Sequence, residues 1–355
     1  MKGIRIFYAA VLIIMLPAAS AIAGWEHINL SGMTVLSIGS RPDNSQYLFA
    51  GTQINGLYAS YNGGTSWDYR IATNVPITDI SYDPWTADSL YAIVNDSYSA
   101  GLHKSSDDGN TWDIVYNIPS PRRLAFDFLN AGYIYICFPT GIMVSQDYGR
   151  NLMNANNGLP ALNILDVMGH GSHDLEGFAA GEAFVAKTTD FGASWSDVGG
   201  LFGLEDYNPS CMAFNTDFPD TIYVACYAYL ARSFDGGANW DYFSTPSSDN
   251  EAIACDPDNS EVIYIGSLGG GVYVSYDGGE SFLSLNSGLG DLNVHCLAVD
   301  AAGRLLAGTE DGVYRYTAEP IPTLSEWGLI ILALLLLAGG TTATIRRRKA
   351  IAASG

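Results

Sequence analysis

The chain has 355 residues, of which 15% are charged and 12% are aromatic, and it contains 39 Gly and 22 Tyr. This composition is typical of an ordered, turn-rich and mostly β protein, and it excludes a disordered chain. Residues 24–320 keep 10 of the 16 Lys and Arg but 36 of the 37 Asp and Glu, which gives this part a net charge of −26. Such a surface repels polyanions, and its largest basic cluster is Arg122-Arg123, so we exclude nucleic acid as a partner.

Residues 1–23 have the features of a secretory signal peptide. Lys2 and Arg5 precede a short apolar run, and Ala21-Ile22-Ala23 forms a small-x-small cleavage site. The alternative is a retained membrane anchor, but the apolar run is short for a membrane span. The sequence therefore predicts an exported chain whose mature part begins at Gly24.

An eight-residue phrase recurs six times through the body of the chain. The copies are SYNGGTSW ending at Trp67, SSDDGNTW at Trp112, SQDYGRNL at Leu152, TTDFGASW at Trp195, SFDGGANW at Trp240 and SYDGGESF at Phe282. Their last residues are separated by 45, 40, 43, 45 and 42 positions. A period of this length is typical of a repeat architecture.

Each repeat reads as four short antiparallel strands, which is the pattern of a propeller blade. A first strand ends in a polar turn, as in DISYDP, and an apolar run such as IYICF forms the second strand. A third strand such as GLYAS leads into the phrase, and a fourth such as WDIVYN follows it. Residues 25–30 resemble a fourth strand without a phrase before it, and residues 304–317 resemble second and third strands without a phrase after them. The sequence therefore predicts an all-β, seven-bladed propeller over residues 24–318, closed by its N- and C-terminal strands.

The repeated phrase resembles the Asp-box of BNR-repeat propellers, a superfamily that includes sialidases, sortilin-like receptors and photosystem assembly factors. In that family the box is structural and lies away from the usual ligand face: the Asp accepts backbone N–H bonds, the Gly permits the turn, and the aromatic residue folds back between sheets. Asn62 and Leu152 depart from the pattern, so their blades are expected to be looser. The structural box residues are Asn62, Trp67, Asp107, Trp112, Asp147, Asp190, Trp195, Asp235, Trp240, Asp277 and Phe282.

The resemblance specifies the fold much better than the activity. A sialidase needs three arginines that converge on a carboxylate, together with a Tyr-Glu nucleophile pair and an acidic Asp. Only Arg70, Arg122 and Arg123 stand near the loops between blades, and such an arginine triad is not evident in the sequence. We therefore predict no catalytic residue and no cofactor, and favour a noncatalytic propeller that binds a protein or a glycan. One alternative is a secreted glycoside hydrolase of sialidase-like or xyloglucanase-like type, and another is an extracytoplasmic assembly factor.

Two segments are candidate ligand contacts. The paired Arg122 and Arg123 could meet an anionic group. The connection at residues 198–210 is the longest between blades, and binding residues often lie on loops carried by a rigid scaffold. Its candidate contact residues are Phe202, Glu205, Asp206 and Tyr207.

Histidine and cysteine patterns point to no cofactor chemistry. His170, His173 and Asp174 are residue types that a metal ion uses, but they fall in a turn after a first strand, so we predict a solvated turn and no metal site. The five cysteines lack CxxC spacing. Cys211 and Cys226 could form a disulfide across one hairpin, and the alternative is that each is a small buried apolar residue.

The C-terminal part, residues 319–355, resembles the IPTL-type sorting signals of Gram-negative bacteria. The matching residues are Ile321, Pro322, Thr323, Leu324, Trp327 and Gly328. An uncharged stretch at residues 327–345 is long enough to span a bilayer, and the basic residues 346–349 mark the cytoplasmic side. The resemblance implies that an exosortase-type enzyme processes the tail. It predicts an inner-membrane precursor with the propeller outside the cytoplasm, and then a protein of the envelope or surface, or a secreted one.

Cleavage of this tail in the native host is a testable expectation. Because the span holds the motif at the outer boundary of the membrane, replacement of Pro322 and Thr323 should leave a longer, membrane-bound form. Intact-mass analysis of the mature protein should find no residues far beyond the motif. Recovery of residues 346–355 on most of the mature protein would instead support a simple membrane anchor.

Overall fold

The computed structural model describes residues 24–71, 74–95, 100–199, 208–214, 218 and 220–317. The predicted signal peptide, the sorting signal and the 327–345 span lie outside these ranges, as do Phe202, Glu205, Asp206 and Tyr207. Within the described ranges, no helix is long and apolar enough to cross a membrane.

The described body consists of seven four-stranded antiparallel sheets, which confirms the predicted all-β propeller. Blade one is β2 (Val35–Arg41), β3 (Asn44–Thr52), β4 (Leu57–Ser60) and β5 (Asp68–Ile71); blade two is β6 (Ile77–Tyr82), β7 (Leu90–Val94), β8 (Gly101–Ser105) and β9 (Asp113–Asn117); blade three is β10 (Arg123–Phe126), β11 (Ile134–Phe138), β12 (Gly141–Ser145) and β13 (Met153–Asn154); blade four is β14 (Ile164–Gly169), β15 (Gly177–Gly181), β16 (Phe184–Thr188) and β17 (Ser196–Asp197); blade five is β18 (Pro209–Phe214), β19 (Ile222–Cys226), β20 (Tyr229–Ser233) and β21 (Asp241–Ser244); blade six is β22 (Asn250–Cys255), β23 (Ile263–Ser267), β24 (Gly271–Ser275) and β25 (Leu283–Ser284); blade seven is β26 (Val294–Val299), β27 (Leu305–Thr309), β28 (Gly312–Thr317) and β1 (Gly24–His27).

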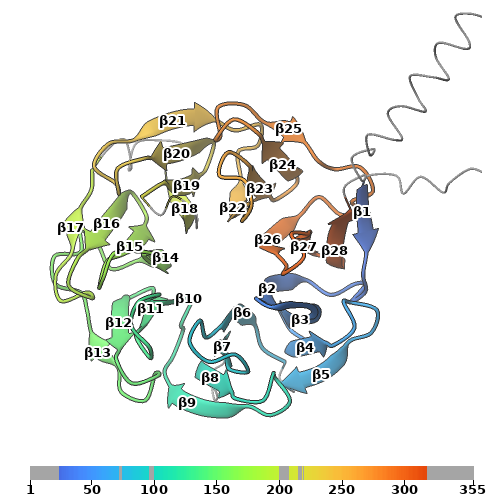
Figure 1. The fold of residues 1–355 in the computed structure, drawn as a ribbon, viewed down its shortest axis with the longest axis horizontal. Coiled ribbons are helices and arrows are strands. Elements are labelled where there is room, and N and C mark those ends of the chain that lie inside the picture. Colours follow the sequence, from blue (N-terminus) through green and yellow to red (C-terminus); the bar gives the residue numbers. More distant parts are fainter. Residues whose placement is uncertain are drawn as a thin grey trace, which may run out of the picture. The chain divides into compact units, whose positions relative to one another are not determined.

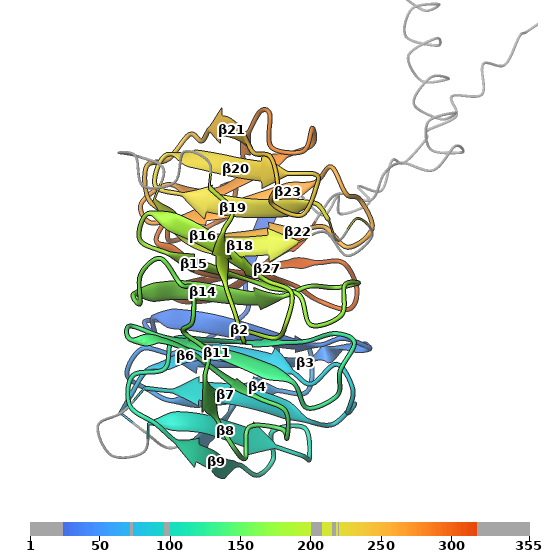
Figure 2. The ribbon, with the colours of Figure 1, turned by 90° about the vertical axis from the view of Figure 1, so that its left-hand side faces the viewer.

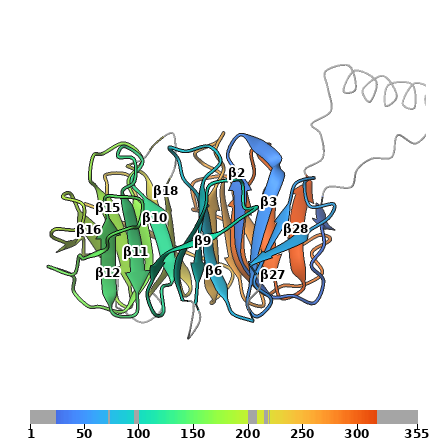
Figure 3. The ribbon, with the colours of Figure 1, turned by 90° about the horizontal axis from the view of Figure 1, so that it is seen from below.

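The first strand of every blade lies innermost, so the seven first strands surround the axis of the ring (Figure 1). Residues of six of these strands line a cavity, and we call the space that they surround the channel. Seen edge-on, the strands run between the two faces of a disc (Figure 2; Figure 3). Because the strands are antiparallel, the Asp-box turns and the turns from first to second strands share one face, which we call the box face. The remaining loops, including those between blades, form the opposite face, which we call the mouth face.

The two ends of the body complete blade seven together. Gly24 pairs with Thr317 and Trp25 pairs with Tyr316, so β1 is the outermost strand beside β28. The backbone N–H of Trp25 also donates to the carbonyl of Ser287 in the preceding connection, at 2.9 Å. These bonds confirm the predicted ring closure, although the strand covers residues 24–27 and not 25–30.

The second strands carry the core. Every residue of β7, β11, β15, β19 and β27 is buried. A strand that packs on a neighbouring blade through both of its faces must be apolar on both, so these strands read as continuous hydrophobic runs and not as alternating ones. The core therefore lies in the spaces between blades.

Each Asp-box closes through the same hydrogen bonds. In blade two, Ser105 Oγ donates to Asp107 Oδ1 at 2.8 Å and accepts the N–H of Gly109 at 2.8 Å, while Asp107 Oδ1 accepts the N–H of Thr111 at 2.8 Å. The glycine has a φ of 76°, in the left-handed region that favours Gly. The bonds from Thr111 and Ser105 hold the pKa of Asp107 below its usual range. The box carboxylates thus serve as hydrogen-bond acceptors within their own turns.

The two departures from the pattern keep this turn. Asn62 Oδ1 accepts the N–H of Ser66 at 2.9 Å, as the Asp does elsewhere, and its amide donates to Ser66 Oγ at 2.8 Å. Leu152 packs against the core between blades two and three. Of the six terminal box residues, only Trp195 is fully buried and the others are half-buried.

Three junctions between blades use a cation that reaches the next Asp-box. Lys187 Nζ donates to the carbonyl of Gly236 at 3.2 Å, Arg232 donates to Gly278 at 2.7 Å, and Arg315 donates to Gly63 at 2.9 Å. The cation occupies the last position before the box Ser or Thr, or the equivalent position in β28. Each acceptor is the glycine that directly follows the box Asp or Asn. A Cβ at Gly236 would lie 3.2 Å from Lys187 Nζ and one at Gly278 would lie 2.7 Å from Arg232 Nη1, so at these two positions glycine leaves room for the cation.

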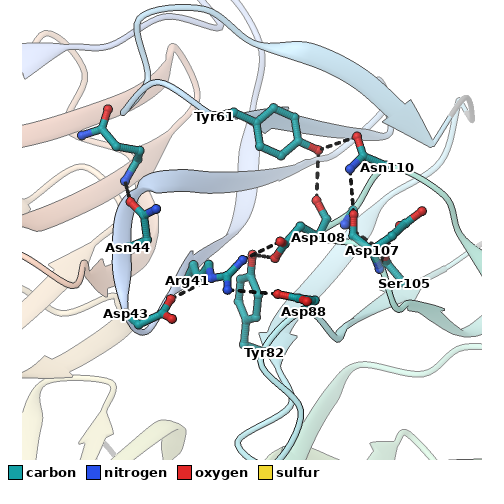
Figure 4. Close-up of polar contacts among 12 residues, drawn as sticks. Arg41, Asp43, Asn44, Tyr61, Tyr82, Asp88, Ser105, Asp107, Asp108 and Asn110 are labelled. Carbon is teal, nitrogen blue, oxygen red and sulfur yellow. Dashed lines mark hydrogen bonds and ion pairs between the residues drawn. The ribbon is translucent and has the colours of Figure 1, made fainter.

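The junction between blades one and two uses a different arrangement (Figure 4). Arg41, at the end of β2, forms ion pairs with Asp88 at 3.0 Å and with Asp108 of the box. The hydroxyl of Tyr61 donates to the carbonyl of Asp108 at 3.0 Å, and that of Tyr82 to its carboxylate at 3.4 Å. Asp108 here replaces the glycine, and the cation approaches from the channel side.

The predicted alternative of a Cys211–Cys226 disulfide is wrong. All five cysteines are free. A bulge places Cys211 opposite Ala225, and Cys226 opposite Pro209. Cys226 packs in the core between blades four and five, while Cys211 lines the channel.

The burial of the box residues predicts their unequal contributions to stability. Trp195 is 5% exposed and donates from Nε1 to the carbonyl of Ala155 at 2.8 Å, whereas Trp112 is half-buried and bonds only within its own turn. Trp195→Ala should lower the free energy of unfolding by about 3–5 kcal/mol, as for other buried large aromatics. Trp112→Ala should lower it less in the same urea titration, and an equal loss for both would contradict the role of interblade burial.

Candidate functional site

The channel wall is built by a bulge near the start of each first strand. The register shifts at this point in six blades, and in blade three the N–H of Arg122 bonds to Cys137 while Arg123 pairs with the same residue. A bulge turns the following side chain, and here it marks seven equivalent positions around the channel. These positions are Ser37, Asp79, Arg123, Asp166, Cys211, Ala252 and Cys296, of which the last six line a cavity of about 190 Å³.

Two of these residues link neighbouring blades. Asp79 accepts the N–H of Ile80 at 2.9 Å and, through its other oxygen, the N–H of Leu124 in blade three at 2.8 Å. Asp166 repeats this arrangement with Val167 at 2.9 Å and with Met212 of blade five at 2.8 Å. All four carboxylate oxygens therefore accept backbone bonds.

Burial controls the ionisation of this pair. It raises the pKa of Asp166 to about 6, although Arg123 and the N–H of Met212 act in the opposite direction. Burial likewise raises the pKa of Asp79. Asp166 is thus a carboxyl that changes charge just below neutral pH.

Arg123 is the cation of the channel. Its side chain makes no hydrogen bond and no ion pair within 4.0 Å with any residue that the structure describes, although Asp79 and Asp166 flank it. Burial alone would lower the pKa of Arg123, but these two carboxylates raise it above its ordinary value. Its guanidinium therefore stays charged and retains donors that face the channel.

Arg122 has a different environment from its neighbour. Its Nη1 donates to Asn163 Oδ1 at 2.9 Å and to the carbonyl of Ile164 at 2.6 Å, and its own carbonyl accepts from Thr78 Oγ1 at 2.9 Å. Arg122 therefore joins three consecutive blades. The third predicted arginine, Arg70, lies on the outermost strand β5, so the three arginines do not converge as in a sialidase site.

A groove of about 440 Å³ opens on the mouth face between blades five and six. We call it the mouth groove; it is lined by Asn208, Pro209, Ser210, Tyr227, Asp249, Asn250 and Glu251. Its first three residues end the predicted contact loop, whose candidate residues lie outside the described ranges.

The mouth groove contains two neighbouring carboxylates, Asp249 and Glu251, without a basic residue in the described structure to neutralise them. Burial, followed by the charge of Asp249, raises the pKa of Glu251, and Arg123 partly offsets this. No Lys or Arg lies within 4.0 Å of either carboxylate among the residues described. Tyr227, on the rim, is 49% exposed. The groove thus combines negative charge with an open aromatic ring, which together attract a cation.

The predicted solvated turn is exposed at Ser172, His173 and Asp174, but it buries His170, whose partners differ from those expected. His170 is 1% exposed and stacks on His173, with ring centroids 4.4 Å apart. Its Nε2 lies 3.8 Å from Glu176 and 3.7 Å from Asp220, whereas Asp174 bonds to Asn130 in another blade.

The tautomer of His170 argues against a metal ion at this cluster. Its Nδ1 accepts the backbone N–H groups of Ser172 at 3.1 Å and His173 at 3.0 Å, so the neutral ring carries its proton on Nε2. A histidine that binds a metal through Nε2 instead donates from Nδ1. His170 therefore takes the place of the turn-forming Asp127 and Asp256 of other blades. The absence of a bound metal stays a prediction.

Sequence reasoning missed most of the channel and groove residues. Asp79, Asp166, Cys211 and Cys296 each stand two positions after the first buried residue of a first strand, in the segments ITD, ILD, PSC and VHC. Alignment of the repeats on their first strands, and not on their boxes, would have placed these side chains in one ring.

Comparison with known proteins gives a motif and a fold. Residues 319–348 match the IPTL-CTERM motif. A xyloglucanase of Hypocrea jecorina (strain QM6a) is 26% identical over 150 residues, and the match covers 31% of this chain and 18% of that protein. The chain therefore spans less than a fifth of that relative.

Solved structures show the same propeller fold. YCF48 from Cyanidioschyzon merolae matches with a TM-score of 0.64 and 16% identity over 83% of this chain and 99% of that one, and a structure of YCF48 bound to D1 peptide matches with a TM-score of 0.62 and 16% identity over 83% and 97%. The extracellular domain of the two-component system BT4673 from B. thetaiotaomicron matches with a TM-score of 0.67 and 14% identity over 82% of this chain and 39% of that one.

The raised pKa of Asp166 predicts a pH dependence of stability. The folded protein binds this proton more tightly than the unfolded chain, so the ionised carboxyl costs stability progressively as pH rises from about 4 to about 6, by at most about 3 kcal/mol. In urea titrations, Asp166→Asn should remove part of this fall. Exposed Asp258→Asn is the matched control, and parallel pH profiles for parent and Asp166→Asn would contradict the assignment.

Proposed function

We propose that this protein is an exported, noncatalytic propeller that binds a basic protein segment in the mouth groove and is sorted to the cell envelope or surface. The supporting observation is that some of its buried or partly buried carboxylates accept hydrogen bonds from the protein, whereas others accept none from the residues described. The carboxylates of Asp79 and Asp166 accept backbone hydrogen bonds from neighbouring blades. Those of Asp249 and Glu251 form no ion pair within the described structure and lie in the same groove as the exposed Tyr227. Only the second pair is placed to recognise a ligand from solution.

A lysine or arginine side chain suits this groove. An ammonium or guanidinium group would relieve the repulsion between Asp249 and Glu251 and could lie over the face of Tyr227. The volume of about 440 Å³ falls within the ordinary range of ligand sites. YCF48, which shares the fold, has been solved with a bound peptide, and this makes peptide recognition by such a propeller reasonable.

The C-terminal motif supports sorting of the protein to the cell envelope or surface. The IPTL-CTERM motif implies recognition by an exosortase-type enzyme. We infer that the 327–345 segment anchors the precursor in the inner membrane, with the propeller outside the cytoplasm, until the tail is processed.

A glycoside hydrolase is the second candidate. The xyloglucanase relative favours it, and Asp166, with a pKa of about 6, has the ionisation of a general acid. Against this, both oxygens of Asp166 and both of Asp79 already accept backbone bonds. A third candidate, an extracytoplasmic assembly factor, would also act through binding and differs only in the identity of its partner.

Peptide binding and turnover can be measured on the same preparation. The full chain in detergent should bind lysine- or arginine-containing peptides more tightly than their glutamine counterparts, with an affinity that falls as salt rises. The Asp249→Asn, Glu251→Gln double variant should bind about tenfold more weakly. Glu261→Gln, on the exposed box face, is the matched control and should bind normally.

Glycan hydrolysis would overturn this function. The same preparation should release no reducing sugar from xyloglucan or sialylated substrates. Turnover that Asp166→Asn abolishes would establish the hydrolase, and equal binding of the glutamine peptides would exclude the mouth groove as a site for basic segments.

A further inference from the structure

A second groove, on the opposite face, contains two basic residues that form no ion pair with a residue that the structure describes. It lies between blades two and three and has a volume of about 560 Å³. We call it the basic groove; its lining residues are Thr86, Lys104, Ser106, Asp113, Ile114, Val115, Tyr148 and Arg150. Such cations are scarce in this body, whose net charge is −26 over residues 24–320.

Lys104 is the exception among the equivalent cations of the repeats. Lys187, Arg232 and Arg315 each donate to the glycine carbonyl of the next box, and each also lies within 3.4 Å of a carboxylate oxygen. In blade three Tyr148 replaces that glycine, and its carbonyl accepts instead from the Tyr91 hydroxyl at 3.4 Å. Lys104 therefore has no backbone acceptor in the next box.

The ammonium of Lys104 is held at the groove by aromatic rings. Its Nζ lies 4.9 Å from the ring centroids of both Tyr91 and Tyr148. Tyr148 is fixed in turn, because its N–H donates to Gly132 at 3.0 Å and its ring packs closely against that glycine. The cation is therefore positioned before any ligand arrives.

The charge of Lys104 is not compensated at close range. Neither Lys104 nor Arg150 forms an ion pair or side-chain hydrogen bond with a residue that the structure describes. Burial lowers the pKa of Lys104, the charge of Arg150 adds to this, and the buried Asp83 acts in the opposite direction. Asp113, opposite Lys104 in the strand pairing, also lines the groove but lies beyond 4.0 Å.

The geometry points to the basic groove as a binding site for a uronic acid residue, a sugar that carries a carboxylate. Lys104 and Arg150 would bind the carboxylate and so relieve their mutual repulsion. Thr86, Ser106 and Asp113 offer hydroxyl and carboxylate partners for sugar hydroxyls. Ile114, which is 53% exposed, offers an apolar surface to the ring.

The other groups of the groove favour a sugar acid over inorganic phosphate. Asp113 repels a phosphate dianion more strongly than a singly charged carboxylate, and it can accept hydrogen bonds from several sugar hydroxyls but from only the one hydroxyl of that dianion. A neutral sugar would leave the two cations unpaired. The groove should therefore discriminate by charge and by the presence of hydroxyl groups.

Calorimetric titration of the full chain in detergent can test this site. Oligogalacturonate is the probe, with the neutral galactose oligomer and inorganic phosphate as comparison ligands. The uronate should bind at least tenfold more tightly than either, and salt should weaken the binding. Lys104→Met and Arg150→Gln should each weaken uronate binding about tenfold, and Asp113→Asn should strengthen it severalfold.

A matched variant separates recognition from stability. Lys187→Met removes the equivalent cation of blade four, which is already paired with Glu176 and Gly236, and should leave uronate affinity unchanged. Circular dichroism on every variant would identify any that fail to fold. Because the Arg150 side chain is exposed, Arg150→Gln tests the site without disturbing the core. Equal affinity for the neutral oligomer or for phosphate, or undiminished uronate binding by folded Lys104→Met and Arg150→Gln, would overturn the assignment.

Discussion

Closure of the ring by β1 on β28 is the constraint on which the rest of this structure depends. A propeller blade buries its second strand only when it has a neighbour on each side, so an open array would expose the apolar faces of its terminal blades. Pairing of Gly24 with Thr317 brings the ends of the body together and supplies blade seven with its outer strand. All seven interblade cores can then be buried.

Polar links hold the closed ring at two levels. Near the channel, Asp79 and Asp166 accept backbone N–H groups from the following blades, and Arg122 donates to the next one. At the box face, Lys187 and Arg232 donate to the next Asp-box. Buried polar groups that find partners across a junction fix the relative position of two blades more specifically than apolar contact does.

The charged groups that form no ion pair in the described structure are those on which the two proposed binding sites rest. Asp249 and Glu251 leave negative charge on the mouth face, and Lys104 and Arg150 leave positive charge on the box face. Each pair consists of like charges that repel, so each is stabilised by an incoming group of opposite sign. A propeller with a basic segment in one groove and an acidic sugar in the other would connect a protein to a glycan at the envelope.

The sequence by itself determined the blade count, the closed ring and the box turns, because these depend on local patterns that recur at a fixed period. The Asp-box is contained within eight residues, and the apolar second strands can be recognised one at a time. The sequence singled out Arg122 and Arg123 together as candidate ligand contacts. Adjacent residues on a strand have different surroundings, and only the tertiary structure decided that Arg122 joins blades while Arg123 faces the channel. The same holds for Asp79 and Asp166, which are far apart in sequence and line one cavity only when the first strands converge. Which charges remain unpaired is a property of neighbouring blades, since Lys104 lacks its acceptor only because Tyr148 occupies the glycine position of the next blade.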